Sequence, residues 1–600
     1  MNVQRAIQAI LHRHEPGEIA GDDLDFTSAD QRTLSEHLKI AFLAMVVGAL
    51  AGGAAILFRS VIDGVTFGAV GFQTGSILDL ARSLPWWHVL LIPAVGGLVV
   101  GWFVQSVSYE RRLHGVPDVI VASFLRQGRL PGRAGVGAAL VSAVSAGVGA
   151  SVGREGPMVH LGASVGSWIA QRLGLRPYDS RTLLACGVAA GVAASFNVPV
   201  GATIFAFELM IRRYSIQRLA PIVIAAVVGT ALIRAYYGDF PAWHVPERIL
   251  VSYWEFPAFA LLGVICACTG FVLIRSVALV SHAMNRLAIP PMLRPALGGL
   301  GVGAIAVFFP HVLGIGYEAA DEALREALPF ALLAALVLAK IAATALSLGA
   351  GFGGGIFSPS LVIGAMTGGA FGVLATAAFP EFSSGHGAYT IVGMAAMAGA
   401  VLHTPFATII IIFEMTASYP LALGVMLAVV ISAILLNDVW RSDFFNWQLK
   451  QRGVNLKEIT PQAVLGDVPV ATLLREDVAT VSASAGLDDM TSAFAAASGP
   501  GVLVVDAVGC LVGRVTYERF RKNAVEGGTA AAEVTAERVA ERDPPSIELS
   551  VDAGRAWVSM REHDTDCLPV VDSRASMRLV GQVTKEDLLT AYHRILVNTS

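Results

Sequence analysis

Apolar stretches follow one another from about residue 37 to about residue 440, and a charged sequence replaces them from about residue 460. A helix that spans a bilayer needs about 20 apolar residues. Stretches long enough for this are residues 39–59, 88–105, 219–237 and 328–347. Residues 182–196 and 199–211 are shorter and contain glycine. The pattern predicts an all-α polytopic membrane protein. Short, broken helices are typical of transporters built from inverted repeats, although length alone leaves imprecise helix ends as an alternative.

Composition shifts along the chain predict five segments. They are an N-terminal segment (1–36), a membrane domain (37–440), a linker (441–464) and two parts of a soluble tail (465–525 and 526–600). The linker carries Arg441, Lys450, Arg452 and Lys457 directly after the last apolar span. Basic residues beside a membrane span favour the cytoplasmic side. We therefore expect a multi-pass protein of the cell (inner) membrane with both termini in the cytoplasm.

The bulk composition supports a membrane protein and excludes several other classes. Hydrophobic residues make up 54% of the 600-residue chain and charged residues only 15%, against about 25% charged in soluble domains. The net charge of −4 indicates no nucleic-acid partner. The five cysteines are scattered and are interpreted as reduced, without a metal pattern. The N-terminus lacks the apolar core of a signal peptide, and no hydrolytic or redox constellation points to an enzyme.

An internal repeat divides the membrane domain into two related halves. GVAAGVAASFNVPVGATIFAFELM and GMAAMAGAVLHTPFATIIIIFEMT align without gaps at an offset of 206 residues. Both contain a proline and end in a Phe-Glu pair, with Glu208 in the first and Glu414 in the second. Upstream, residues 153–157 and 355–359 each have the pattern Gly-x-x-x-Pro at a point where an apolar stretch is interrupted. Matched breaks in two halves predict a substrate site near the middle of the membrane, where broken helix ends converge.

Glu155 is an acidic residue inside an apolar stretch, within the sequence Gly153-Arg154-Glu155-Gly156-Pro157. A charge at that depth costs at least about 2.5–3.5 kcal/mol. Flanking glycines and a following proline indicate a helix N-terminus, which attracts anions through its free N–H groups and its dipole. The position predicts a carboxylate that competes with a permeating anion. The structural alternative is a capping glutamate paired with Arg154.

These motifs resemble those of the CLC family of chloride channels and chloride/proton exchangers. The resemblance rests on GREGP at residues 153–157, GAGFGGGIFSP at residues 349–359 and the paired P…FE segments, and it covers about residues 37–455. It implies two inverted-topology halves of tilted helices. It also implies a homodimer in which each subunit has its own pore for chloride or a similar small anion.

Within this resemblance, Glu155 corresponds to the family's gating glutamate. The backbone N–H groups of Ile356 and Phe357 correspond to donors for the central anion, and such groups bind an ion weakly enough to release it. Residues 113–117 (LHGVP) stand where most members read GSGIP. The resemblance implies an anion-binding set of His114, Gly115, Gly153, Arg154, Gly156, Gly355, Ile356, Phe357 and Phe445.

Three positions depart from the family pattern. His114 replaces a serine whose hydroxyl usually holds the central anion; its side chain either faces the pore or turns toward a polar partner. Phe445 replaces the usual tyrosine, with Phe444 as the alternative if the register shifts by one. Leu209 stands where many exchangers carry a proton-accepting carboxylate. Without both hydroxyls and this carboxylate, the sequence favours a passive channel.

Two further polar residues of the membrane domain have two interpretations each. Glu208 precedes Leu209 and has Glu414 as its repeat mate, which favours a structural role over a proton relay. His160 follows Pro157 by three residues. We expect a histidine with a satisfied structural contact there, with a proton relay beside the gate as the alternative.

The tail contains a second internal repeat. PGVLVVDAVGCLVGRVTYERF (500–520) parallels DCLPVVDSRASMRLVGQVTKEDLL (566–589), and each copy predicts strand, turn, strand and helix. This resembles an α/β tandem pair of CBS modules, which often bind adenine nucleotides (ATP, ADP or AMP). Thr584 and Asp587 match the family's ribose-binding positions, whereas the first copy has Glu518 and no such aspartate. A purely structural pair is the alternative.

Together, these features predict a CLC-type chloride channel that is gated by Glu155 and needs no cofactor or metal. A chloride/proton antiporter regulated by nucleotide binding to the tail is the alternative.

Overall fold

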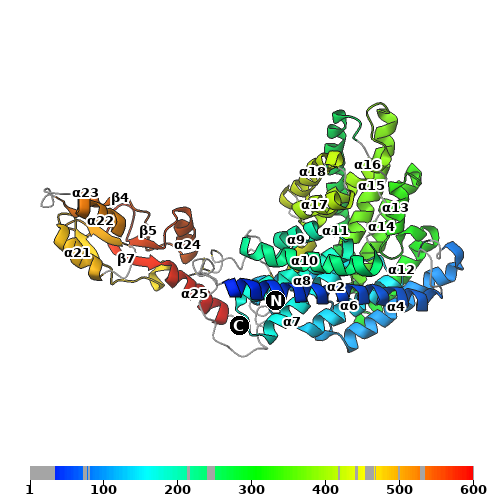
Figure 1. Ribbon diagram of the computed structural model, residues 1–600, viewed down its shortest axis with the longest axis horizontal. Coiled ribbons are helices and arrows are strands. Elements are labelled where there is room, and N and C mark those ends of the chain that lie inside the picture. Colours follow the sequence, from blue (N-terminus) through cyan, green and yellow to red (C-terminus); the bar gives the residue numbers. More distant parts are fainter. Residues whose placement is uncertain are drawn as a thin grey trace. The chain divides into compact units, whose positions relative to one another are not determined.

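The computed structural model describes residues 34–71, 78, 82–211, 216–238, 250–416, 419–439, 444–452, 454, 462, 465–466, 468–496, 501–526 and 534–598. The chain forms two compact units that divide between Gln448 and Leu449 (Figure 1). Of the predicted N-terminal segment (1–36), residues 1–33 lie outside the described residues. Of the predicted linker, only residues 444–452, 454 and 462 are described.

The first half of the helical unit runs from α2 to α10. Its helices are α2 (Leu34–Val70), α4 (Trp86–Ser106), η3 (Tyr109–Arg111), α5 (Val116–Leu125), α6 (Gly132–Gly147), α7 (Glu155–Arg172), α8 (Pro177–Phe196), α9 (Pro199–Ala206), the π-helical turn η4 (Phe207–Ile211) and α10 (Ile216–Tyr237).

The second half runs from the 3-10 turn η5 to the π-helical turn η8, and α19 follows it. Its helices are η5 (Tyr253–Glu255), α11 (Phe256–Arg286), η6 (Pro291–Leu293), α12 (Arg294–Phe308), η7 (Pro310–Val312), α13 (Tyr317–Leu324), α14 (Phe330–Ala350), α15 (Phe357–Ala378), α16 (His386–Leu402), α17 (Pro405–Thr416), α18 (Tyr419–Ala433), η8 (Ile434–Val439) and α19 (Phe444–Gln451).

The helices begin and end where local sequence requires it, and they do so at matching places in the two halves. Proline opens α9 at Pro199 and α17 at Pro405, because its fixed φ suits a first helical residue. The helices before them end on residues in the left-handed region, Asn197 (φ 63°) after α8 and His403 (φ 58°) after α16. Each of these pairs is separated by the repeat offset of 206 residues, so the repeat seen in the sequence is a repeat of structure.

Glycines let the paired helices α7 and α8, and likewise α15 and α16, pack closely. A Cβ atom on Gly162 would clash with the carbonyl of Gly187, and one on Gly187 would clash with the carbonyl of Gly162. Gly364 and Gly393 make the same reciprocal contact in the second half. Without a hydrophobic drive between helices in lipid, such small-residue contacts are a main source of packing energy.

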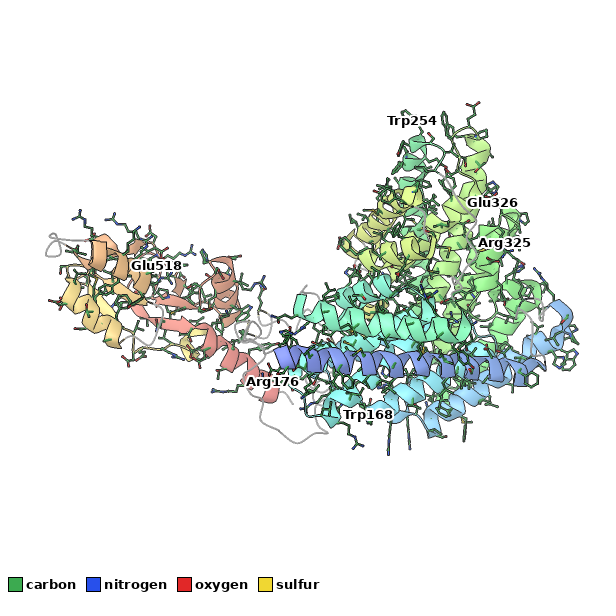
Figure 2. All side chains as sticks on the ribbon, in the orientation of Figure 1. Trp168, Arg176, Trp254, Arg325, Glu326 and Glu518 are labelled. Carbon is green, nitrogen blue, oxygen red and sulfur yellow. The ribbon has the colours of Figure 1, made fainter. Side chains whose placement is uncertain are left out.

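Among the described residues, eight helices are long and apolar enough to cross a membrane. Three of the spans predicted from hydropathy lie within α2, α4 and α10, and the fourth, 328–347, coincides with α14 except for its first two residues, which confirms all four. The predicted short segment 199–211 is correct in extent but divides into α9 and the π-helical turn η4. Figure 2 shows Trp168 and Arg176 near one margin of the helical unit and Trp254 near another. Exposed tryptophans at such margins are typical of membrane–water interfaces.

The C-terminal unit contains two small sheets. The first has the order β1 (Thr480–Ser482), β2 (Gly501–Val505), β3 (Leu511–Thr516) and β4 (Glu541–Arg542). The second has the order β5 (Ile547–Glu548), β6 (Cys567–Val571) and β7 (Leu579–Thr584). The helices are α21 (Leu487–Ala496), α22 (Tyr517–Glu526), α23 (Ala536–Val539), α24 (Ala553–Glu562) and α25 (Lys585–Asn598), with the 3-10 turn η9 (Val470–Thr472). In both sheets the first strand is parallel to the second and the second is antiparallel to the third.

The two copies of this unit exchange segments across the boundary predicted between residues 525 and 526. Val470, from the start of the first copy, packs in the core of the second sheet with Val570. Val539 packs in the core of the first sheet, and β4 pairs with β3. Each parallel pair is closed by a crossover helix of its own copy, α21 between β1 and β2 and α24 between β5 and β6, whereas β4, which completes the first sheet, comes from the second copy. The Leu511 N–H also donates to the Met577 carbonyl at 2.8 Å, which joins the copies.

Candidate functional site

The two Gly-x-x-x-Pro breaks meet each other. The Gly153 N–H donates to the Gly355 carbonyl at 2.7 Å, and the Gly355 N–H donates to the Gly153 carbonyl at 2.7 Å. This antiparallel bridge joins the residues that precede α7 and α15. A Cβ on Gly355 would lie 2.9 Å from the Gly156 nitrogen, so only glycine allows the approach. The contact is reciprocal, as an approximate two-fold relation between the halves requires.

The first turns of three helices line one cavity. Its walls are formed by Val116, Glu155, Gly156, Val159, Val192, Phe196, Phe205, Gly355, Ile356, Phe357, Leu402 and Phe445. Val116 opens α5, Glu155 opens α7 and Phe357 opens α15. The first four N–H groups of a helix have no acceptor within it. Three helix starts around one space therefore provide an electropositive environment built from backbone rather than from lysine or arginine.

Glu155 is the charged residue of this lining. Its side chain is only 4% exposed, and Oε1 accepts a hydrogen bond from the Tyr317 hydroxyl at 2.7 Å. Oε2 has no hydrogen-bond partner among the described residues. A Cβ atom on Gly153 would lie only 2.7 Å from this oxygen, so the glycine leaves room for the carboxylate. One carboxylate oxygen is thus held by the protein, and the other is not held by any hydrogen bond from the described residues.

Tyr317, which the sequence analysis missed, is the first residue of α13. Its hydroxyl lies between Glu155 Oε1 and Ser358 Oγ, which is 3.0 Å away. Because the carboxylate can only accept, the tyrosine donates to it and the serine can donate to the tyrosine. Tyr317 follows Gly316 (φ 89°), the N-cap of α13, as Val116 follows Gly115, the N-cap of α5.

Lys340 of α14 supports the turn that leads to Tyr317. Its ammonium group is buried and donates to the carbonyls of Val312 at 2.9 Å and Gly314 at 3.0 Å. A Cβ on Gly316 would lie 2.8 Å from this nitrogen. A buried ammonium needs hydrogen bonds, so its position and that of the turn depend on each other. Lys340 therefore positions the start of α13 and, through it, the Tyr317 hydroxyl.

Arg154 was predicted as part of the anion-binding set, and its guanidinium makes protein contacts. It donates to the Ser195 carbonyl at 3.0 Å and lies 5.1 Å from the centre of the Tyr317 ring. Its Nε atom is 3.8 Å from Glu155 Oε1, an ion pair without a hydrogen bond. It is absent from the cavity lining described above. The geometry gives Arg154 a role in compensating the buried carboxylate.

Of the two adjacent phenylalanines, Phe445 lines the cavity and Phe444 does not. Phe444 is buried instead against Trp447, with ring centres 5.7 Å apart. The register that places Phe445 at the family's tyrosine position is therefore the one that the structure favours. The cavity has a phenyl ring at this point and lacks a hydroxyl from it.

The structure favours the alternative in which His114 turns toward a polar partner. His114 is absent from the cavity lining, and its Nδ1 atom lies 3.6 Å from Asp118 Oδ1. Its ring is 5.9 Å from that of His160 on α7. Gly115 is the N-cap of α5, and its N–H donates to Asp118 Oδ2 at 2.8 Å. Asp118, in the first turn of α5, thus contacts both His114 and Gly115, and neither of these residues lines the cavity.

Glu208 and Glu414 cap each other's helices. Glu208 accepts from the N–H groups of Phe406 at 3.3 Å and Ala407 at 2.8 Å. Glu414 accepts from those of Val200 at 3.2 Å and Gly201 at 2.9 Å. Phe406 and Ala407 follow Val200 and Gly201, respectively, by the repeat offset of 206 residues. This reciprocal arrangement supports the structural role predicted for Glu208.

Leu209 lies in the π-helical turn η4 and is buried. It is absent from the cavity lining, as is His160.

In the tail, the structure brings Thr584 and Asp587 together at the start of α25. The Thr584 hydroxyl donates to Asp587 Oδ2 at 2.6 Å, and its N–H donates to the same oxygen at 3.0 Å. Arg475 donates to Oδ1 from Nε at 2.9 Å and from a terminal nitrogen at 2.7 Å. Burial alone would raise the pKa of Asp587, but the hydrogen bonds from Arg475 and Thr584 outweigh it and lower the pKa below its usual value. A ribose at this place would compete with Arg475.

Two matched halves of apolar helices, with broken helix starts around one cavity, define a polytopic membrane transport protein. The chain belongs to the CLC family, because residues 96–437 match the family model described as voltage gated chloride channel. Residues 536–594 match the CBS domain model, which confirms the CBS resemblance of the tail.

Relatives of known name support this assignment. The chain is 33% identical over 395 residues to a ClcB-like chloride channel protein of Ralstonia nicotianae, covering 65% of this chain and 91% of that one. It is 31% identical over 435 residues to chloride channel protein CLC-f of Arabidopsis thaliana, covering 67% of this chain and about half (54%) of that one. It is 29% identical over 412 residues to the ClcB channel of Escherichia coli, covering 68% and 98%.

Solved structures share the fold. A slow cyanobacterial Cl⁻/H⁺ antiporter has a TM-score of 0.62 at 21% identity, covering 69% of this chain and 98% of that one. A eukaryotic CLC transporter has a TM-score of 0.61 at 18% identity, covering 92% and 99%. A CLC-type fluoride/proton antiporter has a TM-score of 0.59 at 23% identity, covering 70% and 99%.

Proposed function

We propose that this protein is a chloride channel in which Glu155 gates passive anion movement. The observation that carries the proposal is the shared cavity at the first turns of α5, α7 and α15, with Glu155 in its wall. An anion in this cavity can accept hydrogen bonds from free N–H groups near Gly156, Ile356 and Phe357. Such donors hold an anion without the full charge of a lysine or arginine, so release remains fast.

In this proposal the Glu155 carboxylate occupies an anion position while it is charged. The Tyr317 hydroxyl holds it there through Oε1, and Arg154 reduces the cost of its burial. Protonation removes the charge and weakens the attraction to the helix starts. The side chain then leaves the position to chloride. Anion movement and gating thus depend on the same backbone donors.

Passive transport is supported by three positions at which this chain has neither the usual hydroxyl donors to the anion nor the usual proton-accepting carboxylate. Phe445 brings no hydroxyl to the cavity, and His114 is directed to Asp118. A weakly held anion is expected to pass faster than a tightly held one. Leu209 cannot take up a proton where many family members carry an acid.

A second candidate is chloride/proton exchange, because a buried carboxylate with one free oxygen is itself able to carry a proton. Two solved structures of this fold are named as antiporters, although at these identities the likeness concerns the fold alone.

The current of the purified protein in a bilayer under a chloride gradient distinguishes the two. A channel reverses near the chloride equilibrium potential, and an added pH gradient leaves the reversal potential unchanged. A reversal potential that moves in proportion to the pH gradient would contradict the channel and establish exchange. The Glu155→Gln variant serves as the control, since without an ionisable gate the pH gradient should have no effect in either case.

Further expectations from the sequence belong to the same proposal. They are a homodimer with one pathway per subunit, an inner-membrane location with cytoplasmic termini, the domain limits 1–36, 37–440, 441–464, 465–525 and 526–600, anion binding by the members of the predicted set that line the cavity (Gly156, Gly355, Ile356, Phe357 and Phe445), and no enzymatic activity. Adenine nucleotide binding at Thr584 and Asp587 is proposed for the tail, where Arg475 would have to yield to the ribose.

A further inference from the structure

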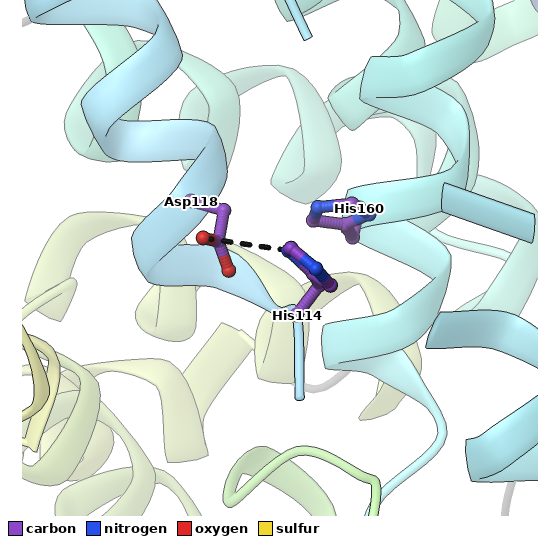
Figure 3. A group of neighbouring side chains, drawn as sticks. All are labelled: His114, Asp118 and His160. Atoms are coloured by element: carbon purple, nitrogen blue, oxygen red, sulfur yellow. Dashed lines mark ion pairs between the residues drawn. The ribbon is translucent and has the colours of Figure 1, made fainter. Parts of the chain in front are cut away.

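Three side chains with metal-ligating atoms lie between α5 and α7. His114 precedes α5, Asp118 is in the first turn of α5, and His160 is in the second turn of α7 (Figure 3). One ligand atom from each lies within 4.8 Å of the others. His160 and Asp118 are buried, and the His114 side chain is 3% exposed. Histidines two helices apart and an aspartate thus converge on one point inside the protein.

The chemistry of this group suits a transition metal. Two imidazole nitrogens and one carboxylate oxygen are the ligand types of zinc sites that keep a fourth position open. Imidazole favours Zn²⁺, Cu²⁺, Ni²⁺ and Co²⁺ over Mg²⁺ and Ca²⁺, which prefer oxygen ligands alone. None of these three residues lines the anion cavity, so the group is separate from the pathway described above.

The distances are close to those of a formed site. With metal–ligand bonds of about 2.0–2.2 Å, ligand atoms in a tetrahedral site lie roughly 3.3 Å apart. His114 Nδ1 and Asp118 Oδ1 are already 3.6 Å apart. The remaining separations, at most 4.8 Å, shorten with small side-chain rotations.

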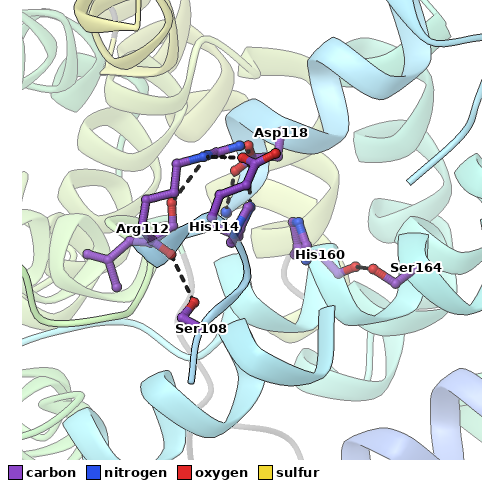
Figure 4. Close-up of polar contacts among 9 residues, drawn as sticks. Ser108, Arg112, His114, Asp118, His160 and Ser164 are labelled. Atoms are coloured by element: carbon purple, nitrogen blue, oxygen red, sulfur yellow. Dashed lines mark hydrogen bonds and ion pairs between the residues drawn. The ribbon is translucent and has the colours of Figure 1, made fainter. Parts of the chain in front are cut away.

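The surrounding contacts orient the aspartate. Asp118 Oδ2 accepts from the Gly115 N–H at 2.8 Å, and Oδ1 accepts from Arg112 at 2.7 Å. Figure 4 shows Arg112 beside Asp118, with His160 on the other side of His114. Arg112 also donates to Glu110 at 2.7 Å, so it keeps a partner if Oδ1 turns to a metal. Outer contacts of this kind orient ligands in metal sites.

We propose that His114, Asp118 and His160 form a site for a divalent transition-metal ion, with Zn²⁺ as the preferred ion. A bound ion joins the start of α5 to α7. Val116 of α5 and Val159 of α7 are neighbours of these ligands in sequence and line the anion cavity. An ion that fixes the two helices to each other therefore restricts the cavity wall, and we expect Zn²⁺ to slow anion transport.

The first experiment measures binding to the purified, tag-free, full-length protein. After equilibration with Zn²⁺ and removal of free ion, elemental analysis should find one Zn²⁺ per chain, and calorimetry should show no binding of Mg²⁺. Co²⁺ should give visible absorption bands of a four- or five-coordinate ion. His160→Gln and His114→Gln should each weaken Zn²⁺ binding by about tenfold or more, the loss that even an outer contact of a metal site can cause.

Matched variants separate a lost ligand from a disturbed fold. His160→Cys keeps a metal-ligating atom, so it should retain binding and shift preference toward Cd²⁺, which favours thiolate. His282→Gln removes an exposed histidine of α11 and should leave Zn²⁺ binding unchanged. Arg112→Gln removes a competing cation from Oδ1 and should tighten binding severalfold.

The effect on transport is measured as chloride efflux from liposomes, with each variant compared with its own metal-free rate. Zn²⁺ should slow the wild-type protein and not the His160→Gln variant. Wild-type protein that binds no Zn²⁺, or binding that His114→Gln and His160→Gln leave intact, would overturn the site. Binding without any change in efflux would remove the proposed clamp on the cavity. These outcomes do not depend on whether the protein is a channel or an exchanger.

Discussion

At the scale of single residues, Glu155 combines three features that ordinary capping glutamates do not share. It is buried, it lies at a helix start that lines a cavity, and one of its oxygens has no partner among the described residues. A fixed structural carboxylate would use both oxygens, as Glu208 and Glu414 do. The difference supports the gate proposed for Glu155 over a purely structural cap.

Glu155→Gln tests this role because glutamine keeps the shape and removes the charge. We expect chloride efflux from liposomes to become nearly independent of pH over the range in which the wild-type rate changes. Glu381→Gln, at an exposed glutamate, is the control and should keep the wild-type profile. A Glu155→Gln variant that retains the wild-type pH dependence would remove the gate assignment.

Tyr317→Phe tests the hydrogen bond that holds the gate. A hydrogen bond to a charged group contributes about 1.5–3 kcal/mol, so its loss should let the carboxylate leave the cavity more readily. We expect faster chloride efflux than wild type at the same pH. Tyr253→Phe, at an exposed tyrosine of η5, should have no effect. Equal or slower efflux in Tyr317→Phe would show that the bond does not oppose opening.

At the scale of elements, the two halves are joined by reciprocal contacts. The start of α7 pairs with the start of α15 through Gly153 and Gly355. The start of α17 is capped by Glu208 of η4, and the start of α9 is capped by Glu414 of α17. Each contact occurs twice because the halves have the same structure and face each other. The breaks in the helices are therefore stabilised by the opposite half rather than by their own sequence.

Glu208→Ala and Glu414→Ala should destabilise the protein to a similar extent, by about 0.5–2 kcal/mol each, as expected for the loss of a helix cap. Thermal unfolding of the purified protein in detergent measures this. Each variant is the matched control of the other. A loss of proton movement in Glu208→Gln that is absent in Glu414→Gln would instead support the relay alternative for Glu208.

At the scale of the whole molecule, the tail is a second unit with its own two cores. Its copies share segments, so residues near 470 complete the second sheet and residues near 540 complete the first. Asp587 connects these parts through Arg475. Any ligand that replaces Arg475 at Asp587 thus changes how one copy is held to the other.

Asp587→Asn should weaken the tail at neutral pH. The pKa of Asp587 is lowered in the folded protein, since the hydrogen bonds from Arg475 and Thr584 outweigh its burial. Its contribution to stability is therefore present above the unfolded value, about 3.8, and is lost as the pH falls through the lower folded value. Hydrogen exchange of the full protein should show faster opening of α25 in the variant at pH 7 and no difference well below pH 3.8. A difference that persists there would show that the aspartate acts through packing instead of charge.

Much of the membrane fold could be predicted because its signals are local. The spans in α2, α4, α10 and α14 follow from apolar length, and the matched halves follow from a gapless repeat. The paired breaks and the helix start at Glu155 follow from glycine and proline. By contrast, the division of residues 199–211 into α9 and η4 has no sequence signal that we recognise.

The sequence by itself determined the membrane class, the two halves and the placement of Glu155 at a buried helix start. Burial of apolar length and the conformational limits of glycine and proline act over a few residues and are readable there. Tertiary structure alone decided that Tyr317 holds Glu155 across 162 positions of sequence. It also decided that His114 turns to Asp118 and His160, and that Phe445 rather than Phe444 lines the cavity. These depend on which side chains meet when distant helices pack, and no local pattern specifies that.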